Sequence, residues 1–166
     1  MIQPFVTAEE LAGLGPVALL DVGVNGDGVP PLEAFISGHL RGSAFLDMDR
    51  WAAGPATDQG GRHPLPDPGV FAEGMRRAGV GRQQAVVAYD RVGGVFAARL
   101  VWLLRSIGHP AALLDGGMNA VGTDRERGEA TPELGDFTAV TWPAEHFADM
   151  AEVERIGREC VEGTAT

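Results

Sequence analysis

Lysine is missing from this 166-residue sequence, and all 13 basic residues are arginine. A chain without lysine cannot form a Schiff base, supply the lysine of a phosphate-binding P-loop, or use lysine as a general base. Acidic residues number 23, which gives a formal net charge of -10. This balance argues against nucleic-acid binding, because such proteins need clustered basic residues.

Cysteine is nearly absent as well, so the chain cannot form an internal disulfide. Cys160 has Glu159 and Glu162 as neighbours in the sequence. Nearby carboxylates disfavour the reactive thiolate, so we interpret Cys160 as an incidental thiol. The histidines are far apart and lack the spacing of a zinc site. We therefore expect no metal ion, and we expect no cofactor. The four histidines are His39, His63, His109 and His146.

No apolar run approaches the roughly 20 residues that a membrane span requires. The first fifteen residues, "MIQPFVTAEELAGLG", lack the basic and long apolar regions of a signal peptide. We expect a cytoplasmic protein without membrane contact. The hydrophobic content of 45% is typical of a globular chain with a core of its own.

Short strands alternate with helices along the first three quarters of the chain. Apolar runs predict strands at 17–22, 44–49, 84–89 and 111–115. Thr7 and Glu10 form a capping-box pattern for a helix over 8–13, and further helices are predicted from Asp67-Pro68 to about 78 and over about 94–107. This alternation indicates an α/β domain with a mostly parallel sheet.

The character of the chain changes after Val121. We assign residues 1–124 to the domain and 125–166 to a polar, turn-rich linker that ends at the start of a helix. Met150, Val153 and Ile156 give that helix an apolar stripe.

Two motifs contain residues capable of chemistry. "FLDMDR" has the Asp-x-Asp pattern of aspartyl-phosphate phosphatases, but those enzymes also need a lysine. We therefore expect Asp47 and Asp49 to end a strand and cap the segment after it. In "GRHPLP", Arg62 and His63 either reach a binding site or only order their own loop.

A third motif, "YDRVGGVFAAR", places a strand, a tight loop and a helix in succession. The loop comprises Asp90, Arg91, Val92, Gly93 and Gly94. Such a turn points backbone N–H groups into one hollow at the positive end of the helix, where an anion is stabilised. A cysteine at position 90 would become a thiolate able to carry sulfane sulfur. Asp90 instead can fill the hollow with its own carboxylate, and would repel another anion.

Taken together, these pieces resemble the N-terminal, non-catalytic domain of two-domain rhodaneses, the thiosulfate and 3-mercaptopyruvate sulfurtransferases. The matching segments span most of residues 5–122. They are "LLDV", "GHLRGSAFLDMD", "GRHPLP", "VVAYDRVGGVFAARLVWLLRSIGH" and "LLDGG". "LLDV" is often followed by arginine in the family, so we expect Gly23 to loosen the polar ties of that strand.

The resemblance implies a five-stranded, mainly parallel sheet with helices on both faces. It also implies that catalysis belongs to a second, similar domain whose active-site loop begins with cysteine, and that Asp90 stands at the persulfide position here. No catalytic residue is then expected in this chain. Its partners would be the second rhodanese domain of the same polypeptide and a small sulfur-containing substrate at the domain interface, with Arg62 and His63 as candidate contacts.

Two functions compete on this basis. In the first, the chain is the inactive half of a sulfurtransferase that moves sulfane sulfur from thiosulfate or 3-mercaptopyruvate to cyanide or a thiol. In the second, it is a stand-alone inactive module that binds a protein partner or senses an anion. A phosphatase of the same fold is a distant third, because position 90 is Asp and position 96, where an arginine is needed, is Phe.

Overall fold

The computed structural model describes residues 2–25, 28–58, 60–120, 122 and 124–163. The strands are β1 (Phe5–Val6), β2 (Ala18–Gly23), β3 (His39–Leu40), β4 (Ser43–Asp47), β5 (Val86–Tyr89), β6 (Ala111–Leu114) and β7 (Arg125–Glu126). The helices are α1 (Ala8–Gly13), α2 (Pro31–Ser37), α3 (Met48–Trp51), α4 (Pro68–Arg77), α5 (Val95–Ser106) and α6 (Met150–Gly163), with 3-10 turns η1 (Gly117–Asn119) and η2 (Ala144–His146).

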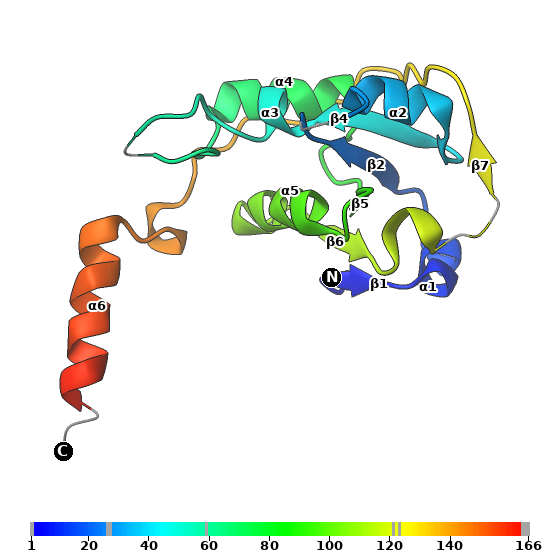
Figure 1. Ribbon diagram of the computed structural model, residues 1–166. Coiled ribbons are helices and arrows are strands. Elements are labelled where there is room, and N and C mark those ends of the chain that lie inside the picture. Colours follow the sequence, from blue (N-terminus) through cyan, green and yellow to red (C-terminus); the bar gives the residue numbers. More distant parts are fainter. Residues whose placement is uncertain (1, 26–27, 59, 121, 123, 164–166) are drawn as a thin grey trace.

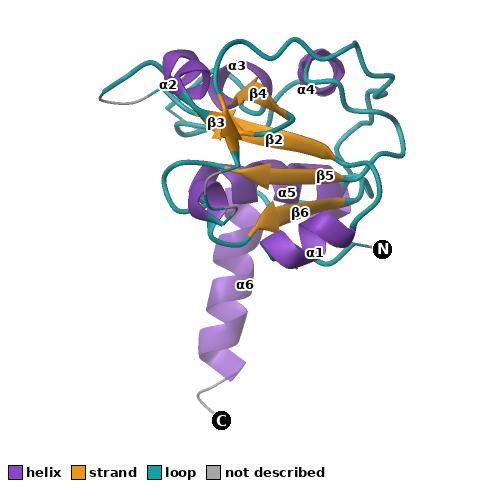
Figure 2. Cartoon of the chain, turned by 90° about the vertical axis from the view of Figure 1, so that its right-hand side faces the viewer, coloured by secondary structure: helices purple, strands orange, loops and turns teal. Residues whose placement is uncertain are grey.

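The main sheet has five parallel strands in the order β1-β6-β5-β2-β4. This confirms the expected α/β fold, and Figure 2 shows β2, β5 and β6 side by side. The sequence did not indicate β1, because two residues are too short to show an alternating pattern. β3 and β7 form a separate antiparallel pair beside the sheet.

Helices cover both faces of the sheet, as expected. Side chains alternate across β5, with Val86 and Ala88 in the core cluster that includes α4 and α5. Val87 and Tyr89 point to the opposite face, where residues of α1 and η1 pack. Because the parallel strands all end at the same edge, the loops that follow β2, β5 and β6 gather there beside α3, which follows β4 directly (Figure 1).

The segment between β7 and α6 lies along the domain. Phe137 is 4% exposed and packs edge-on against Phe71 at 6.0 Å between ring centroids. The indole N–H of Trp142 donates to the carbonyl of Pro66 over 2.7 Å. The assignment of this segment as a linker stays a prediction, and the structure adds that it is held against the domain surface.

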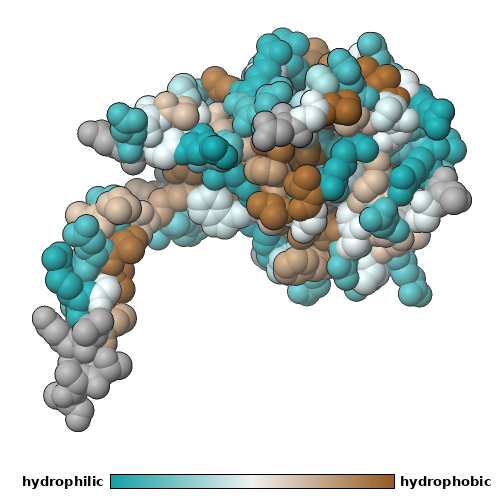
Figure 3. All heavy atoms as spheres, viewed as in Figure 1, coloured by the Kyte–Doolittle hydropathy of each residue, from teal (hydrophilic) through white to brown (hydrophobic). Residues whose placement is uncertain are grey.

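The last helix, α6, projects away from the domain (Figure 1). Met150, Val153 and Ile156 are exposed on it, and its hydrophobic atoms lie along one side (Figure 3). Within the described residues, no helix combines the length and apolar character that a membrane crossing requires.

Candidate functional site

Asp90 follows β5 directly, and its carboxylate lies inside the turn that leads into α5. Only 2% of the residue is exposed. Oδ1 accepts hydrogen bonds from the backbone N–H groups of Val92 and Gly94 at 2.9 and 2.7 Å. Oδ2 accepts those of Phe96 and Ala97 at 2.9 and 3.0 Å. The predicted anion hollow therefore exists, and the carboxylate of the chain itself occupies it.

Two glycines give this loop its shape. Gly93 and Gly94 have φ values of 87° and 90°, which L side chains rarely adopt. A Cβ on Gly94 would also lie 3.2 Å from the side chain of Leu113. This curvature aims successive N–H groups at one point, which is the arrangement that binds anions.

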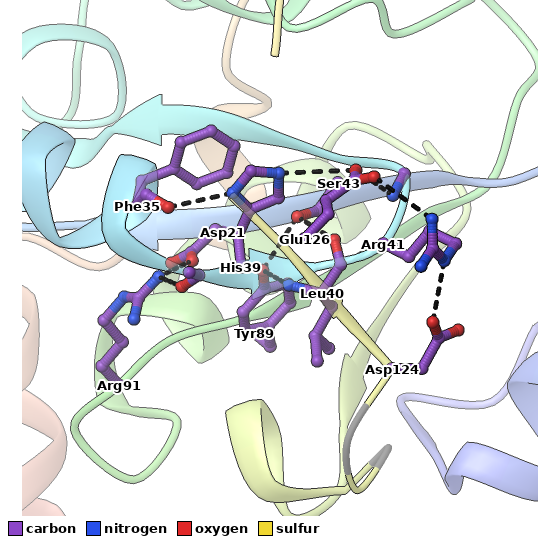
Figure 4. A network of polar contacts seen from close by, with 12 residues as sticks. Asp21, Phe35, His39, Leu40, Arg41, Ser43, Tyr89, Arg91, Asp124 and Glu126 are labelled. Atoms are coloured by element: carbon purple, nitrogen blue, oxygen red, sulfur yellow. Dashed lines mark hydrogen bonds and ion pairs between the residues drawn. The ribbon is translucent and has the colours of Figure 1, made fainter. Parts of the chain in front are cut away.

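Arg91 fixes the other side of the loop. Its Nη2 donates to Oδ2 of Asp21 and to the carbonyl of Gly38, both at 2.7 Å (Figure 4). Asp21 is 1% exposed, and burial raises the pKa of its carboxyl although Arg91 lowers it in part. Sequence reasoning placed Arg91 in the loop but did not find its partner, Asp21, 70 residues away.

Tyr89 anchors the end of β5 beneath the loop. Its hydroxyl accepts the backbone N–H of Leu40 at 3.0 Å and shares a 2.9 Å hydrogen bond with Ser43 Oγ. Burial raises the pKa of the Tyr89 phenol, which therefore stays protonated. Figure 4 shows how these contacts join β5 to β3. No sequence pattern indicated this network.

The two aspartates of "FLDMDR" have different roles. Asp47 caps α3, accepting the N–H of Arg50 at 3.1 Å, as expected. The expected capping role of Asp49 is wrong. Its Oδ2 accepts both the backbone and the side-chain N–H of Asn25 at 2.9 Å, and its Oδ1 lies 3.3 Å from Nε2 of His63. Asp49 therefore joins the loop after β2 to the "GRHPLP" loop.

The loop of Arg62 and His63 is ordered from two sides. Asp49 contacts the imidazole of His63, and Arg99 donates to the His63 carbonyl over 2.8 Å. Arg62 lines the same hollow as Arg91, so the fold brings it beside the Asp90 loop. Contact of Arg62 and His63 with a substrate or a second domain stays a prediction.

Gly23, where the chain departs from the family pattern, lies at the end of β2. A Cβ there would lie 2.5 Å from the ring of Phe45 and 2.7 Å from Cβ of Pro31. These side chains fill the space that an arginine would enter, and Gly23 stays in register with Asp47 of β4. Gly23 is therefore closely packed and stays paired within the sheet, and the expected effect on polar ties stays a prediction.

Cys160 lies exposed on α6, the helix that projects away from the domain with the Asp90 loop. It comes late in a helix that also contains Glu154 and Glu159. The structure therefore places the single thiol of the chain on a different element from the anion hollow.

Comparison with known proteins identifies the family of this chain. The rhodanese-like domain family matches residues 7–124. SseB of Mycobacterium tuberculosis, named for thiosulfate sulfurtransferase activity, is 34% identical over 83% of this chain and 51% of its own length. A Pseudomonas aeruginosa relative, named for 3-mercaptopyruvate sulfurtransferase activity, is 39% identical over 60% of this chain and 37% of its own length. The chain thus spans about half the length of SseB and less of the second relative.

Two solved structures of sulfurtransferases are also similar to this chain. SseA of Escherichia coli, a 3-mercaptopyruvate sulfotransferase, superposes with a TM-score of 0.76 and 26% identity over 95% of this chain and 63% of that one. The 3-mercaptopyruvate sulfurtransferase of Leishmania major superposes with a TM-score of 0.68 and 25% identity, covering 84% of this chain and 40% of that one. The chain with the Asp90 loop therefore belongs to the rhodanese-like domain family.

Proposed function

We propose that this chain is the non-catalytic N-terminal domain of a cytoplasmic two-domain sulfurtransferase. The complete protein would transfer sulfane sulfur from thiosulfate or 3-mercaptopyruvate to a thiophilic acceptor such as cyanide or a thiol. The names of the relatives support the reaction class, and the share of each relative that the chain covers supports a second domain.

The observation that carries the proposal is the occupied hollow at Asp90. Sulfur transfer needs a thiolate that attacks the sulfane sulfur, releases sulfite or pyruvate, and holds the sulfur as a persulfide until the acceptor takes it. At the corresponding turn here, an internal carboxylate accepts four N–H groups. It leaves no donors for a thiolate and repels an anionic substrate, so the chemistry is assigned to a second domain.

In this proposal, the domain completes and covers the site of its partner. Val92 in the Asp90 loop and Val95 directly after it are 55% and 65% exposed, an apolar rim suited to docking. The apolar stripe of α6 is also exposed and would pack on the second domain. Arg62 and His63 lie at this edge and are the proposed contacts with the partner site.

The test compares the complete polypeptide with the 166-residue chain. The complete protein should convert thiosulfate or 3-mercaptopyruvate, and replacing the active-site cysteine of its second domain with serine should abolish turnover. The isolated chain should be inactive. A reading frame that encodes no second rhodanese-like domain would overturn the proposal in favour of a stand-alone binding module.

A further inference from the structure

A cavity of about 400 Å³ lies at the edge of the sheet where β5 and β6 begin, opposite the edge that carries the Asp90 loop. We call it the His109 cavity. Three parts of the chain meet there: the loop before β5, the turn between α5 and β6, and the segment between β7 and α6. The residues that line it include Arg82, Ile107, His109, Phe137 and Val140.

The imidazole of His109 supplies a hydrogen-bond acceptor to this cavity. Its Nε2 lies 2.9 Å from the carbonyl oxygen of Gln84 and must be the donor, because a carbonyl only accepts. Burial lowers the pKa of His109, so the ring is neutral at neutral pH and its Nδ1 carries a lone pair. Nδ1 has no partner among the described residues, and none of their fully buried side-chain nitrogens or oxygens lacks one. Nδ1 is therefore accessible to a ligand.

Arg82 supplies hydrogen-bond donors and a positive charge. Its backbone N–H donates to Oδ1 of Asp136 over 2.6 Å, which fixes the loop before β5 to the segment after β7. Within the part of the chain that is described, its guanidinium has no acceptor. A guanidinium presents its donors in a planar fork that matches a carboxylate. The cavity thus combines one fixed acceptor with one cation.

The rest of the lining favours an aromatic body between these two polar groups. The Phe137 ring is 4% exposed and lies 5.0 Å from the His109 ring, tilted by 59°. Aromatic rings prefer such tilted or offset contacts with one another. Ile107 is half-buried and Val140 is 44% exposed, so both leave apolar surface at the cavity. Sites for small molecules typically pair an apolar lining with a few placed polar groups.

We propose that the His109 cavity binds a small aromatic acid whose ring also carries a hydroxyl group. The hydroxyl donates to Nδ1 of His109, and the carboxylate pairs with Arg82. The ring lies beside Ile107, Phe137 and Val140. Thiosulfate has neither a ring nor a hydroxyl donor, so the ligand differs in chemistry from the sulfur donors named above. The inference goes beyond the proposed function and does not depend on it.

A ligand in this cavity would contact two parts of the molecule at once. Arg82 and His109 belong to the domain, whereas Phe137 and Val140 belong to the segment between β7 and α6. A ligand that binds only the closed arrangement stabilises that arrangement. Hydrogen exchange of the amides of residues 137–140 should therefore slow when the ligand binds.

The first experiment titrates the 166-residue chain with 4-hydroxybenzoate, benzoate and phenol at neutral pH. Binding is followed by the ¹⁵N resonance of Nδ1 of His109. We expect 4-hydroxybenzoate to bind and to shift this resonance. Benzoate lacks the hydroxyl donor and phenol lacks the carboxylate, so each should bind roughly tenfold more weakly. These comparisons use the unaltered protein, so they test the His109 contact without a change in its fold.

The second experiment compares Arg82→Gln with Arg127→Gln, which removes the same charge from an exposed arginine outside the cavity. We expect Arg82→Gln to weaken 4-hydroxybenzoate roughly tenfold, and Arg127→Gln to leave its binding unchanged. Phenol makes no use of the guanidinium, so its binding should be the same in Arg82→Gln and wild type. Matching melting curves for the two variants ensure that a loss of binding is not a loss of fold.

Three results would overturn the inference. The first is that 4-hydroxybenzoate does not bind or leaves the His109 resonance unmoved. The second is that benzoate binds as tightly as 4-hydroxybenzoate, which would mean that Nδ1 accepts no bond from the ligand. The third is equal binding of 4-hydroxybenzoate to Arg82→Gln and Arg127→Gln.

Discussion

Arg91 and Asp21 form an ion pair, with 2.7 Å between Nη2 and Oδ2, that ties the Asp90 loop to β2. The Asp21 side chain is 1% exposed, whereas that of Arg91 is 30% exposed. The loop is therefore fixed by a charge that reaches in from the surface to a buried carboxylate. A carboxylate in this position is costly if its partner is removed, because water cannot replace the guanidinium.

Replacing Arg91 with alanine should lower the free energy of unfolding by about 3 kcal/mol, since Asp21 is left buried without its charge partner. Urea unfolding measures the change. The matched control is Arg155→Ala, which breaks an exposed pair with Glu159 on α6 and should cost less than about 1 kcal/mol. Adding Asp21→Asn to Arg91→Ala should restore part of the loss. Equal effects of Arg91→Ala and Arg155→Ala would contradict this account of the loop.

The four hydrogen bonds that Asp90 accepts should contribute strongly to the stability of the folded chain. Asp90→Ala should cost about 3 kcal/mol, because four charge-assisted bonds that its buried carboxylate accepts from backbone N–H groups of the turn are lost. Asp67 caps α4 with only two N–H contacts at an exposed position, so Asp67→Ala should cost about 1 kcal/mol. Chemical denaturation of both variants measures the two losses in unfolding free energy and tests whether that of Asp90→Ala is the larger. If Asp90→Ala were no worse than Asp67→Ala, the internal carboxylate would not organise the turn.

The close packing at Gly23 can be tested with a single methyl group. Gly23→Ala should destabilise the chain by about 2 kcal/mol, since its Cβ meets Phe45 and Pro31. Gly38 has extended backbone with φ of 165°, and its Cβ would meet nothing within 4 Å. Gly38→Ala should therefore leave the thermal melting temperature nearly unchanged. Similar melting temperatures for the two variants would show that Phe45 moves aside easily.

The environment of His109 predicts that the stability of the folded chain depends on pH. It is 8% exposed, its Nε2–H donates to the carbonyl of Gln84, and burial lowers its pKa below the ordinary value of 6.5. The unfolded chain thus binds a proton at a higher pH than the folded one, so stability falls as pH drops below 6.5 toward the folded pKa.

The measurement for His109 is urea unfolding at a series of pH values between about 5 and 7, around the ordinary histidine pKa. His109→Gln should flatten the decline at the acid end. His146→Gln, at a less buried histidine, serves as the control and should leave the profile as in wild type. An unchanged slope in His109→Gln would mean that other groups cause the acid sensitivity.

The parts of the structure that follow local patterns could be predicted from the sequence. Thr7 and Glu10 form the predicted capping box of α1, and the strand, double glycine and helix around Asp90 predicted the anion hollow. Contacts between distant residues left no such pattern. The Arg91–Asp21 pair spans 70 residues, and Phe137 is a single buried ring within a polar stretch. Asp49 was expected to be a cap from its local pattern, because its bonds to Asn25 and His63 depend on how α3 and two loops meet.

The central claim is that this chain does not carry sulfur by itself. The most direct measurement incubates the isolated chain with thiosulfate, records its intact mass, and then adds cyanide and follows thiocyanate, with Cys160→Ala as the control. We predict no added sulfur on the protein, and thiocyanate formation equal in wild type and Cys160→Ala. A persulfide on Cys160, with turnover that the Cys160→Ala variant loses, would contradict the account.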